Sequence, residues 1–408
     1  MKPAPKLKSE PVSEKLVRTL IHPVRTASIS VLKFSPDGKQ LLVGGYPSGV
    51  LQLWDTGTWE ERRRIETPPG YRGSADYAEL TADWKTVVVP VENRKVVRGE
   101  KDGKQTVHVE MSGEVRSWDL TTGKPRPPLK LAGRDPIYAF ISPDGTKLLT
   151  LERKSYDANG RSRPADVAVL HDTAAGTSRE LATGFGMAAF SPNSRRFVVA
   201  NGSRNSEPAR LRLFDTATPG EPATLAQEKD ANIHWPTFSP DGRYVAAEVR
   251  FAEGGGVRVW DVAARTLAAE FKPLTPVPVL YPEFVNGSKL VAGCDTKGNA
   301  YVWDVAAKKA AFTYKAGEAG EARKVVVSPD GKRAAVALWP PIKRDEIARD
   351  PDPADLPQPW VELYDLASGE KTETLFCPHG VAWQLAFSPD GNVLAVGGSG
   401  AVHLFDVK

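Results

Sequence analysis

The chain has 408 residues, of which 54 are Lys or Arg and 50 are Asp or Glu, so its formal net charge is +4. This near balance, with 25% charged and 41% apolar residues, is typical of a globular protein and does not fit a dedicated nucleic-acid binder. Two cysteines exclude a disulfide-dense scaffold, and no apolar run approaches the ~20 residues that span a bilayer. The 35 Gly and 34 Pro residues indicate many tight turns.

In chain order, the first residues carry Lys and Pro but no apolar run of the kind found in signal peptides. We therefore expect a cytoplasmic protein. An exported form whose signal lies outside this sequence stays open as the alternative. We expect residues 1–12 to be a flexible tail.

A four-residue motif, Ser-Pro-Asp-Gly, then recurs along the chain. Five intact copies begin at Ser35, Ser142, Ser239, Ser328 and Ser388, and weaker copies stand at Thr81, Ser191 and Val285. A pair made of an aromatic residue and Asp follows each copy, with His171 once in the aromatic place. These pairs end at Asp55, Asp119, Asp172, Asp215, Asp261, Asp304, Asp365 and Asp406. The two motifs alternate eight times, which indicates a repeat architecture.

The spacing of these Asp residues indicates the kind of repeat. Four intervals measure 41 to 46 residues, close to the ~40–45 residues of a four-stranded propeller blade. The other three measure 53, 61 and 64 residues, so they contain insertions. Ser, Pro and Gly at the first, second and fourth places suit a type I turn. Each repeat is predicted to run strand a, Ser-Pro-Asp-Gly turn, strand b, loop, strand c ending in the aromatic–Asp pair, turn, strand d.

With these motifs in register, the sequence resembles the WD-repeat β-propeller family over nearly its whole length. The resemblance implies an all-β fold, a single closed β-propeller of four-stranded blades over residues 13–408. We expect eight blades, with seven as the alternative if the copy at Thr81 is not a full blade. The chain ends two residues after Asp406, and residues 15–23 resemble residues 371–379, which hold the strand d place of repeat seven. We therefore expect the N-terminal strand to complete the last blade, as is common in this family.

The long repeats carry most of their extra residues between strands b and c, near 92–112, 152–166 and 339–360. In the family that the sequence resembles, b–c loops share one face with the d–a connections. Loops on a rigid scaffold often carry function, although surface loops also tolerate insertions without any function. We favour a binding face, and the candidate partner-binding residues are Arg94, Lys95, Arg98, Arg153, Lys154, Arg161, Arg163, Trp339, Arg344 and Trp360. For the two tryptophans, which stand at the ends of the seventh insert, anchoring of that insert on its blade is the alternative that we favour.

Side chains that carry chemistry are scattered along the chain. The six His residues form no metal-binding pair at short spacing, and the chain has no nucleophile elbow and no phosphate-binding loop. We therefore expect no catalytic residue, cofactor or metal. Cys294 and Cys377 are expected to be free thiols, and glycines 254–256 a flexible connection. His22, His234 and His379 fall near d–a connections, where the family often places a His bonded to an Asp of the b–c turn. That Asp is absent from most repeats here.

The sequence therefore predicts a non-enzymatic scaffold that binds a protein or peptide on the face carrying the b–c inserts. We expect a monomeric propeller without a membrane span, and the charge balance does not favour nucleic acid as a partner. The alternative is an enzyme or small-molecule binder that uses the central channel, as some other propeller families do.

Overall fold

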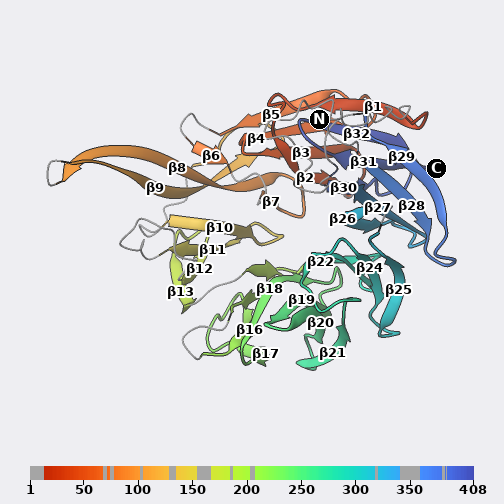
Figure 1. Cartoon of the computed structure of the whole chain (residues 1–408). Coiled ribbons are helices and arrows are strands. Elements are labelled where there is room, and N and C mark those ends of the chain that lie inside the picture. The colour runs from red at the N-terminus through yellow and green to blue at the C-terminus, as the bar shows by residue number, and fades with distance from the viewer. Residues whose placement is uncertain are drawn as a thin grey trace.

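The computed structural model describes residues 13–67, 71–73, 78–101, 104–127, 135–153, 167–183, 187–202, 207–317, 320–340, 359–378, 382 and 384–408. For residues 71–73, 92–112, 135, 137, 153 and 182–183 the description covers the backbone only. All regular secondary structure in these parts of the chain is β-strand. The strands form eight four-stranded sheets, here called blades, arranged in a ring (Figure 1). The predicted eight-bladed propeller is confirmed, and the seven-blade alternative is wrong.

Each blade is one repeat of the sequence, read from its innermost strand outward. Blade 1 contains β2 (Ser28–Phe34), β3 (Gln40–Tyr46), β4 (Val50–Asp55) and β5 (Glu61–Glu66). Blade 2 contains β6 (Tyr71–Gly73), β7 (Glu79–Leu80), β8 (Thr86–Lys101) and β9 (Lys104–Asp119). Blade 3 contains β10 (Asp135–Ile141), β11 (Lys147–Arg153), β12 (Val167–Asp172) and β13 (Ser178–Thr183). Blade 4 contains β14 (Ala188–Phe190), β15 (Arg196–Ala200), β16 (Ala209–Asp215) and β17 (Ala223–Glu228).

The second half of the ring repeats the same order. Blade 5 contains β18 (Ala231–Phe238), β19 (Tyr244–Phe251), β20 (Gly254–Asp261) and β21 (Thr266–Phe271). Blade 6 contains β22 (Val279–Val285), β23 (Leu290–Asp295), β24 (Ala300–Asp304) and β25 (Lys309–Tyr314). Blade 7 contains β26 (Glu321–Val327), β27 (Arg333–Trp339), β28 (Trp360–Asp365) and β29 (Lys371–Phe376). Blade 8 contains β30 (Gln384–Phe387), β31 (Val393–Gly397), β32 (Ala401–Asp406) and β1 (Leu16–Ile21).

The N-terminal strand β1 is the outermost strand of blade 8 and lies beside β32. The two strands pair antiparallel, from Leu16 opposite Phe405 to Ile21 opposite Ala401. Both ends of the chain therefore meet in one sheet (Figure 1). As predicted, β1 supplies the strand that the eighth repeat lacks, and it covers an edge that β32 would otherwise expose.

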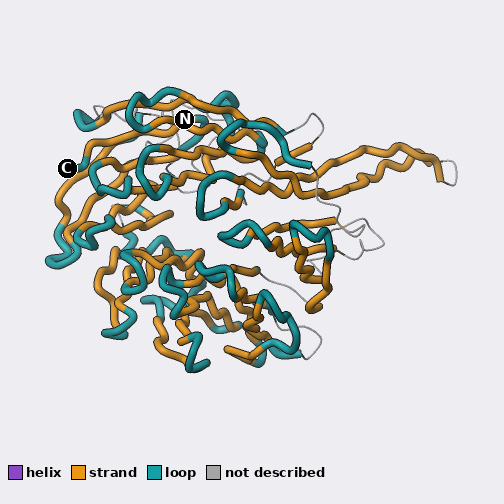
Figure 2. The backbone as a smooth tube through the Cα atoms, turned by 180° about the vertical axis from the view of Figure 1, so that it is seen from behind, coloured by secondary structure: helices purple, strands orange, loops and turns teal. Residues whose placement is uncertain are grey.

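Blade 2 departs from the regular pattern. Its strands β8 and β9 have 16 residues each and stay paired from Thr86 opposite Asp119 to Lys101 opposite Lys104. The pair extends beyond the ring as an arm (Figure 2). The insert expected as a loop near 92–112 is instead a continuation of strands b and c. Two short strands, β6 and β7, share the inner edge of β8.

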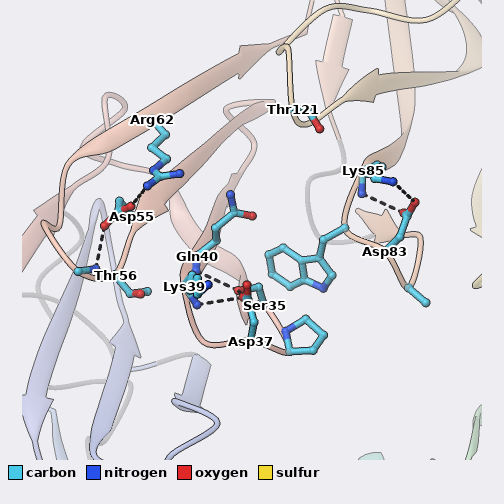
Figure 3. Close-up of a pocket in the computed structure, with 14 residues that line it drawn as sticks. Ser35, Asp37, Lys39, Gln40, Asp55, Thr56, Arg62, Asp83, Lys85 and Thr121 are labelled. Atoms are coloured by element: carbon cyan, nitrogen blue, oxygen red, sulfur yellow. Dashed lines mark hydrogen bonds and ion pairs between the residues drawn. The ribbon is translucent and has the colours of Figure 1, made fainter.

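The Ser-Pro-Asp-Gly motif forms the turn between strands a and b, and its side chains explain why it repeats. In blade 1, Ser35 Oγ donates to Asp37 Oδ1 at 2.6 Å and accepts the backbone N–H of Gln40 at 2.9 Å (Figure 3). Gly38 adopts φ +71°, a left-handed conformation that favours glycine. The other intact copies make the same bonds, so each motif closes its own hairpin.

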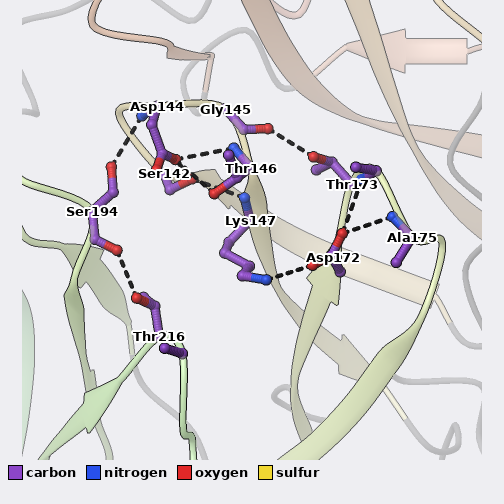
Figure 4. A network of polar contacts seen from close by, with 12 residues as sticks. Ser142, Asp144, Gly145, Thr146, Lys147, Asp172, Thr173, Ala175, Ser194 and Thr216 are labelled. Atoms are coloured by element: carbon purple, nitrogen blue, oxygen red, sulfur yellow. Dashed lines mark hydrogen bonds and ion pairs between the residues drawn. The ribbon is translucent and has the colours of Figure 1, made fainter.

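Neighbouring turns are also bonded to one another. In blade 3 the backbone N–H of Asp144 donates at 3.0 Å to Ser194 Oγ, which belongs to the turn of blade 4 (Figure 4). Ser194 stands where intact motifs have Gly, and its carbonyl accepts a hydrogen bond from Thr216 Oγ1 at 2.8 Å. A degenerate motif therefore still supplies a contact between blades.

Every strand c ends at the Asp of an aromatic–Asp pair, as predicted. The carboxylate then accepts backbone N–H groups of the following turn; Asp172 Oδ1, for example, accepts those of Ala174 at 3.0 Å and Ala175 at 2.7 Å. These bonds, with the Lys147 ammonium 2.5 Å away, lower the pKa of Asp172 to about 2. The motif thus holds a charged carboxylate inside each c–d turn.

The core lies between the blades. Because successive strand residues point to opposite sides of a sheet, each blade presents one apolar surface to each neighbour. Between blades 5 and 6, for example, Ala246 and Val257 pack against Val279 and Val291. The repeat tryptophans Trp118, Trp260 and Trp303 are at most 5% exposed and Trp54 is half-buried, which confirms their packing role.

Glycines 254–256 are a correction to the sequence analysis. They are paired residues of β20, opposite Phe251, Arg250 and Val249 of β19, and not a flexible connection. The backbone needs glycine here because a Cβ added at Gly256 would lie 2.4 Å from the carbonyl oxygen of Phe271.

Candidate functional site

The strand order defines two faces of the propeller. Each blade is an antiparallel meander, so its b–c turn and its d–a connections lie at one end and its a–b and c–d turns at the other. We call the first end the loop face and the second the turn face. The inserts of repeats two, three and seven therefore belong to the loop face.

The structure describes the candidate residues unevenly. Arg94, Lys95 and Arg98 lie on β8 in the arm, and Arg153 ends β11; for all four the description covers the backbone only. Four other candidates lie outside the described residues: Lys154, Arg161, Arg163 and Arg344. Only Trp339 and Trp360 can be judged by their side-chain contacts.

Trp339 ends β27 and Trp360 begins β28, and both side chains are half-buried. The indole of Trp360 packs against the apolar cluster between blades 6 and 7, and its Nε1 donates to Glu362 Oε1 at 3.3 Å. The guanidinium carbon of Arg323 lies 5.2 Å from the centre of the Trp339 ring. Both rings rest on the blade, which favours the anchoring role.

The structure brings together an aromatic pair that the sequence analysis did not find. Trp235 on β18 and Tyr281 on β22 come from the innermost strands of blades 5 and 6, and their ring centroids are 4.3 Å apart. Each lies at a break in the strand register and has a positive φ, +53° for Trp235 and +50° for Tyr281. A β-bulge turns a side chain out of the alternating pattern of a strand. The two bulges therefore aim both rings toward each other, and Tyr281 remains 52% exposed.

Two further apolar side chains are exposed on the loop face of the same two blades. Leu274, on the d–a connection between them, is 52% exposed, and its backbone N–H donates to Tyr301 Oη at 2.9 Å. Phe251, at the b–c turn of blade 5, is 37% exposed. Large exposed apolar groups that lie near one another mark interaction surfaces. We call Trp235, Phe251, Leu274 and Tyr281 the blade 5–6 patch.

A buried ion pair lies on β19 of the same blade. Glu248 is fully buried, and its Oε1 accepts hydrogen bonds from Arg250 Nη2 at 2.9 Å and Nε at 3.2 Å. Burial raises the pKa of Glu248, and the hydrogen bonds and charge of Arg250 oppose that rise. His234 pairs with Glu248 in the strand register, and burial, followed by the charge of Arg250, lowers its pKa. His234 is therefore neutral near pH 7.

The innermost strands also carry a charged pair. Lys324 Nζ on β26 lies 2.8 Å from Glu283 Oε2 on β22. Crowding opposes ionisation of Glu283, but the charges of Lys324 and Lys33 hold the pKa of its carboxyl below the usual value. Within the described ranges, no group of three or more His, Cys, Asp or Glu side chains could hold a metal ion.

The histidine at the first d–a connection differs from the family pattern, as expected. His22 is buried, and its Nε2 lies 3.5 Å from Ser48 Oγ of the b–c turn, where the family often has Asp. Asp295, which does match that pattern, accepts hydrogen bonds from Asn299 Nδ2 at 2.8 Å and from Tyr301 Oη at 2.7 Å. These groups hold the ends of strands b and c.

Both cysteines, Cys294 and Cys377, are free and buried. Burial raises the pKa of each thiol to about 12, so neither is a nucleophile at neutral pH. Among the residues with a described backbone, no helix is long and apolar enough to cross a membrane.

Comparisons with known proteins agree with this architecture. Residues 14–55 and 369–406, which include the two ends of the chain that meet in blade 8, match the family model described as WD domain, G-beta repeat. Among solved structures, the chain is similar to the C-terminal WD40 domain of Sif2, at 15% identity and a TM-score of 0.66, over 97% of this chain and 98% of that one.

A second solved structure is the Cps50 (Swd1) β-propeller domain of Myceliophteria thermophila. It has 11% identity and a TM-score of 0.55, over 98% of this chain and 100% of that one. No curated protein matches the chain. The solved structures bear on the fold, and the matched repeats confirm the resemblance found in the sequence.

Proposed function

We propose that this WD-repeat β-propeller is a non-enzymatic scaffold that binds a protein or peptide partner on its loop face. WD40 propeller domains generally serve as protein-interaction scaffolds. The observation that carries the choice of face is the blade 5–6 patch. It exposes Phe251, Leu274 and Tyr281 at the end of the propeller from which the inserts emerge.

The chemistry of the patch favours a partner segment with apolar or aromatic side chains. Tyr and Trp are enriched at the centres of protein interfaces because their large rings bury much area at little entropic cost. The side chain of Arg250 is 37% exposed beside them and offers hydrogen-bond donors. The proposed scaffold is monomeric and cytoplasmic, and the arm residues Arg94, Lys95 and Arg98 extend the same face.

Affinity capture with matched variants tests this function. The full-length chain is immobilised, and captured proteins are quantified by mass spectrometry. The variants are Tyr281→Ala and a chain in which residues 341–358 are replaced by a short Gly-Ser linker. The control is Leu267→Ala, because Leu267 is 49% exposed but begins the strand after a c–d turn, on the turn face.

A partner bound as proposed is retained by the wild type and by the Leu267→Ala control. Its capture falls by about tenfold or more with at least one loop-face variant, which corresponds to the ~1.4 kcal/mol expected for the loss of a hot-spot contact. Unchanged capture by both loop-face variants would contradict the proposed face.

A further inference from the structure

The a–b turns pack against one another around the turn face. The turn Pro of one blade lies beside the turn Gly of the next, so that a Cβ added at Gly38 would be 3.6 Å from Pro389 Cδ. The same contact joins Gly391 to Pro329 and Gly242 to Pro192. Glycine thus brings adjoining turns into direct contact.

The junction between blades 1 and 2 is different. Blade 2 has Trp84 where the intact motifs have Gly, and this Trp adopts the same left-handed conformation, with φ +57°. Its indole packs partly against the core between the two blades. Beside it a groove of about 760 Å³ lies between the turns of blades 1 and 2, lined by Pro36 and Trp84 among others (Figure 3).

The carboxylates that line this groove already have partners in their own turns. Asp37 Oδ1 accepts Ser35 Oγ and the backbone N–H of Lys39. Asp55 accepts backbone N–H groups of its turn through Oδ1 and the Arg62 guanidinium through Oδ2. The side-chain hydrogen bond from Ser35 lowers the pKa of Asp37, and backbone hydrogen bonds lower that of Asp55.

The cations that line the groove keep more of their donors free. Arg62 is 55% exposed and binds Asp55 through one terminal nitrogen. Lys85 is 68% exposed, and its ammonium lies 3.6 Å from Asp83. Lys39 is exposed, and no carboxylate in the described part of the chain lies within ion-pair distance of its ammonium. The groove therefore combines an indole face with unused cationic donors.

We propose that this groove is a second docking site, on the face opposite the loop face, and that it takes a short acidic peptide segment with an apolar side chain against Trp84. Charge complementarity supports an acidic segment, because the lining carboxylates are bonded within their turns and the lining ammonium groups are not. A peptide fits better than a nucleic acid. Three carboxylates, Asp37, Asp55 and Asp83, also line the groove and would repel a continuous row of phosphates.

Selection from a random displayed peptide library on the immobilised full-length chain tests the proposal. The enriched peptide is synthesised with a fluorescent label and titrated against each variant by anisotropy. We expect acidic peptides with an apolar residue. Trp84→Gly and Lys39→Glu should each weaken binding about tenfold or more, and Lys332→Glu should change it less than about twofold. Lys332 is the matched control because it follows the Gly of the blade 7 turn as Lys39 follows Gly38.

Trp84→Gly restores the residue of the intact motifs, and Lys39→Glu leaves Trp84 in place, so a folding defect in one variant does not remove the test. Enrichment of non-acidic peptides, or equal affinity for the wild type and both groove variants, would overturn the proposal. So would binding of an oligouridylate probe that is lost with Trp84→Gly, because the groove would then take nucleic acid. Replacement of residues 341–358 should leave the affinity unchanged, which separates this site from the loop-face site.

Discussion

Closure of the ring by β1 predicts a large effect from one side chain near the N-terminus. Leu20 is 3% exposed and packs in the cluster between blades 8 and 1, whereas Val17 on the same strand is 57% exposed. Removal of a buried Leu side chain costs about 2–5 kcal/mol. Because Leu20 lies on an outermost strand, where neighbours can relax, we expect about 3 kcal/mol for Leu20→Ala. Val17→Ala should cost less than about 0.5 kcal/mol.

Equilibrium urea unfolding, followed by tryptophan fluorescence and by circular dichroism, measures both variants. The account predicts a lower midpoint for Leu20→Ala with an unchanged slope, and a wild-type midpoint for Val17→Ala. A wild-type midpoint for Leu20→Ala would refute the closure, because β1 would then contribute nothing to blade 8. Equal losses from both variants would show that β1 does not present the buried side observed here.

Three further outcomes follow from the turns and the core. Gly369→Ala should cost about 1 kcal/mol in thermal or urea unfolding, since Gly369 has φ +74° with open space around it, whereas Gly317→Ala is the control at an ordinary φ. The pKa of Asp172 is about 2, below its unfolded value of 3.8. Its contribution is therefore complete above about pH 4 and is lost as the pH falls through 2. Asp172→Asn should flatten that part of a profile of melting temperature against pH. Cys294 and Cys377 should react with a thiol reagent at pH 7 only after denaturation, and rapid reaction of the native chain would contradict their burial.

The repeat motifs predicted most of the fold because their chemistry is local. A Ser-Pro-Asp-Gly turn such as that at Ser35 closes through bonds within six residues, and each aromatic–Asp pair ends strand c through bonds to its own turn. The place of β1 was predictable because residues 15–23 resemble the strand d of repeat seven. The arm of blade 2 was predictable only as an insertion by its length. Its paired form had one signal, an Asp-Gly dipeptide at 102–103 between runs rich in Val.

The blade 5–6 patch could not be predicted from the motifs. Trp235 and Tyr281 are 46 positions apart, and their contact depends on a bulge in each of two strands. The one local signal is that Pro follows both aromatic residues inside strand a, since Pro cannot donate to a strand ladder. Trp84 raises the same difficulty, because a Trp in the place of a turn Gly has no local explanation until blade 1 lies beside it.

Hydrogen–deuterium exchange of the propeller, alone and bound to the partner recovered by affinity capture, tests the central claim most directly. The account predicts slower exchange at residues 251–254 and 272–281, on the loop face of blades 5 and 6. It also predicts unchanged exchange at the a–b turn of blade 7, residues 328–333. Protection confined to the turns, with the loop face unchanged, would contradict the claim that the loop face binds the partner.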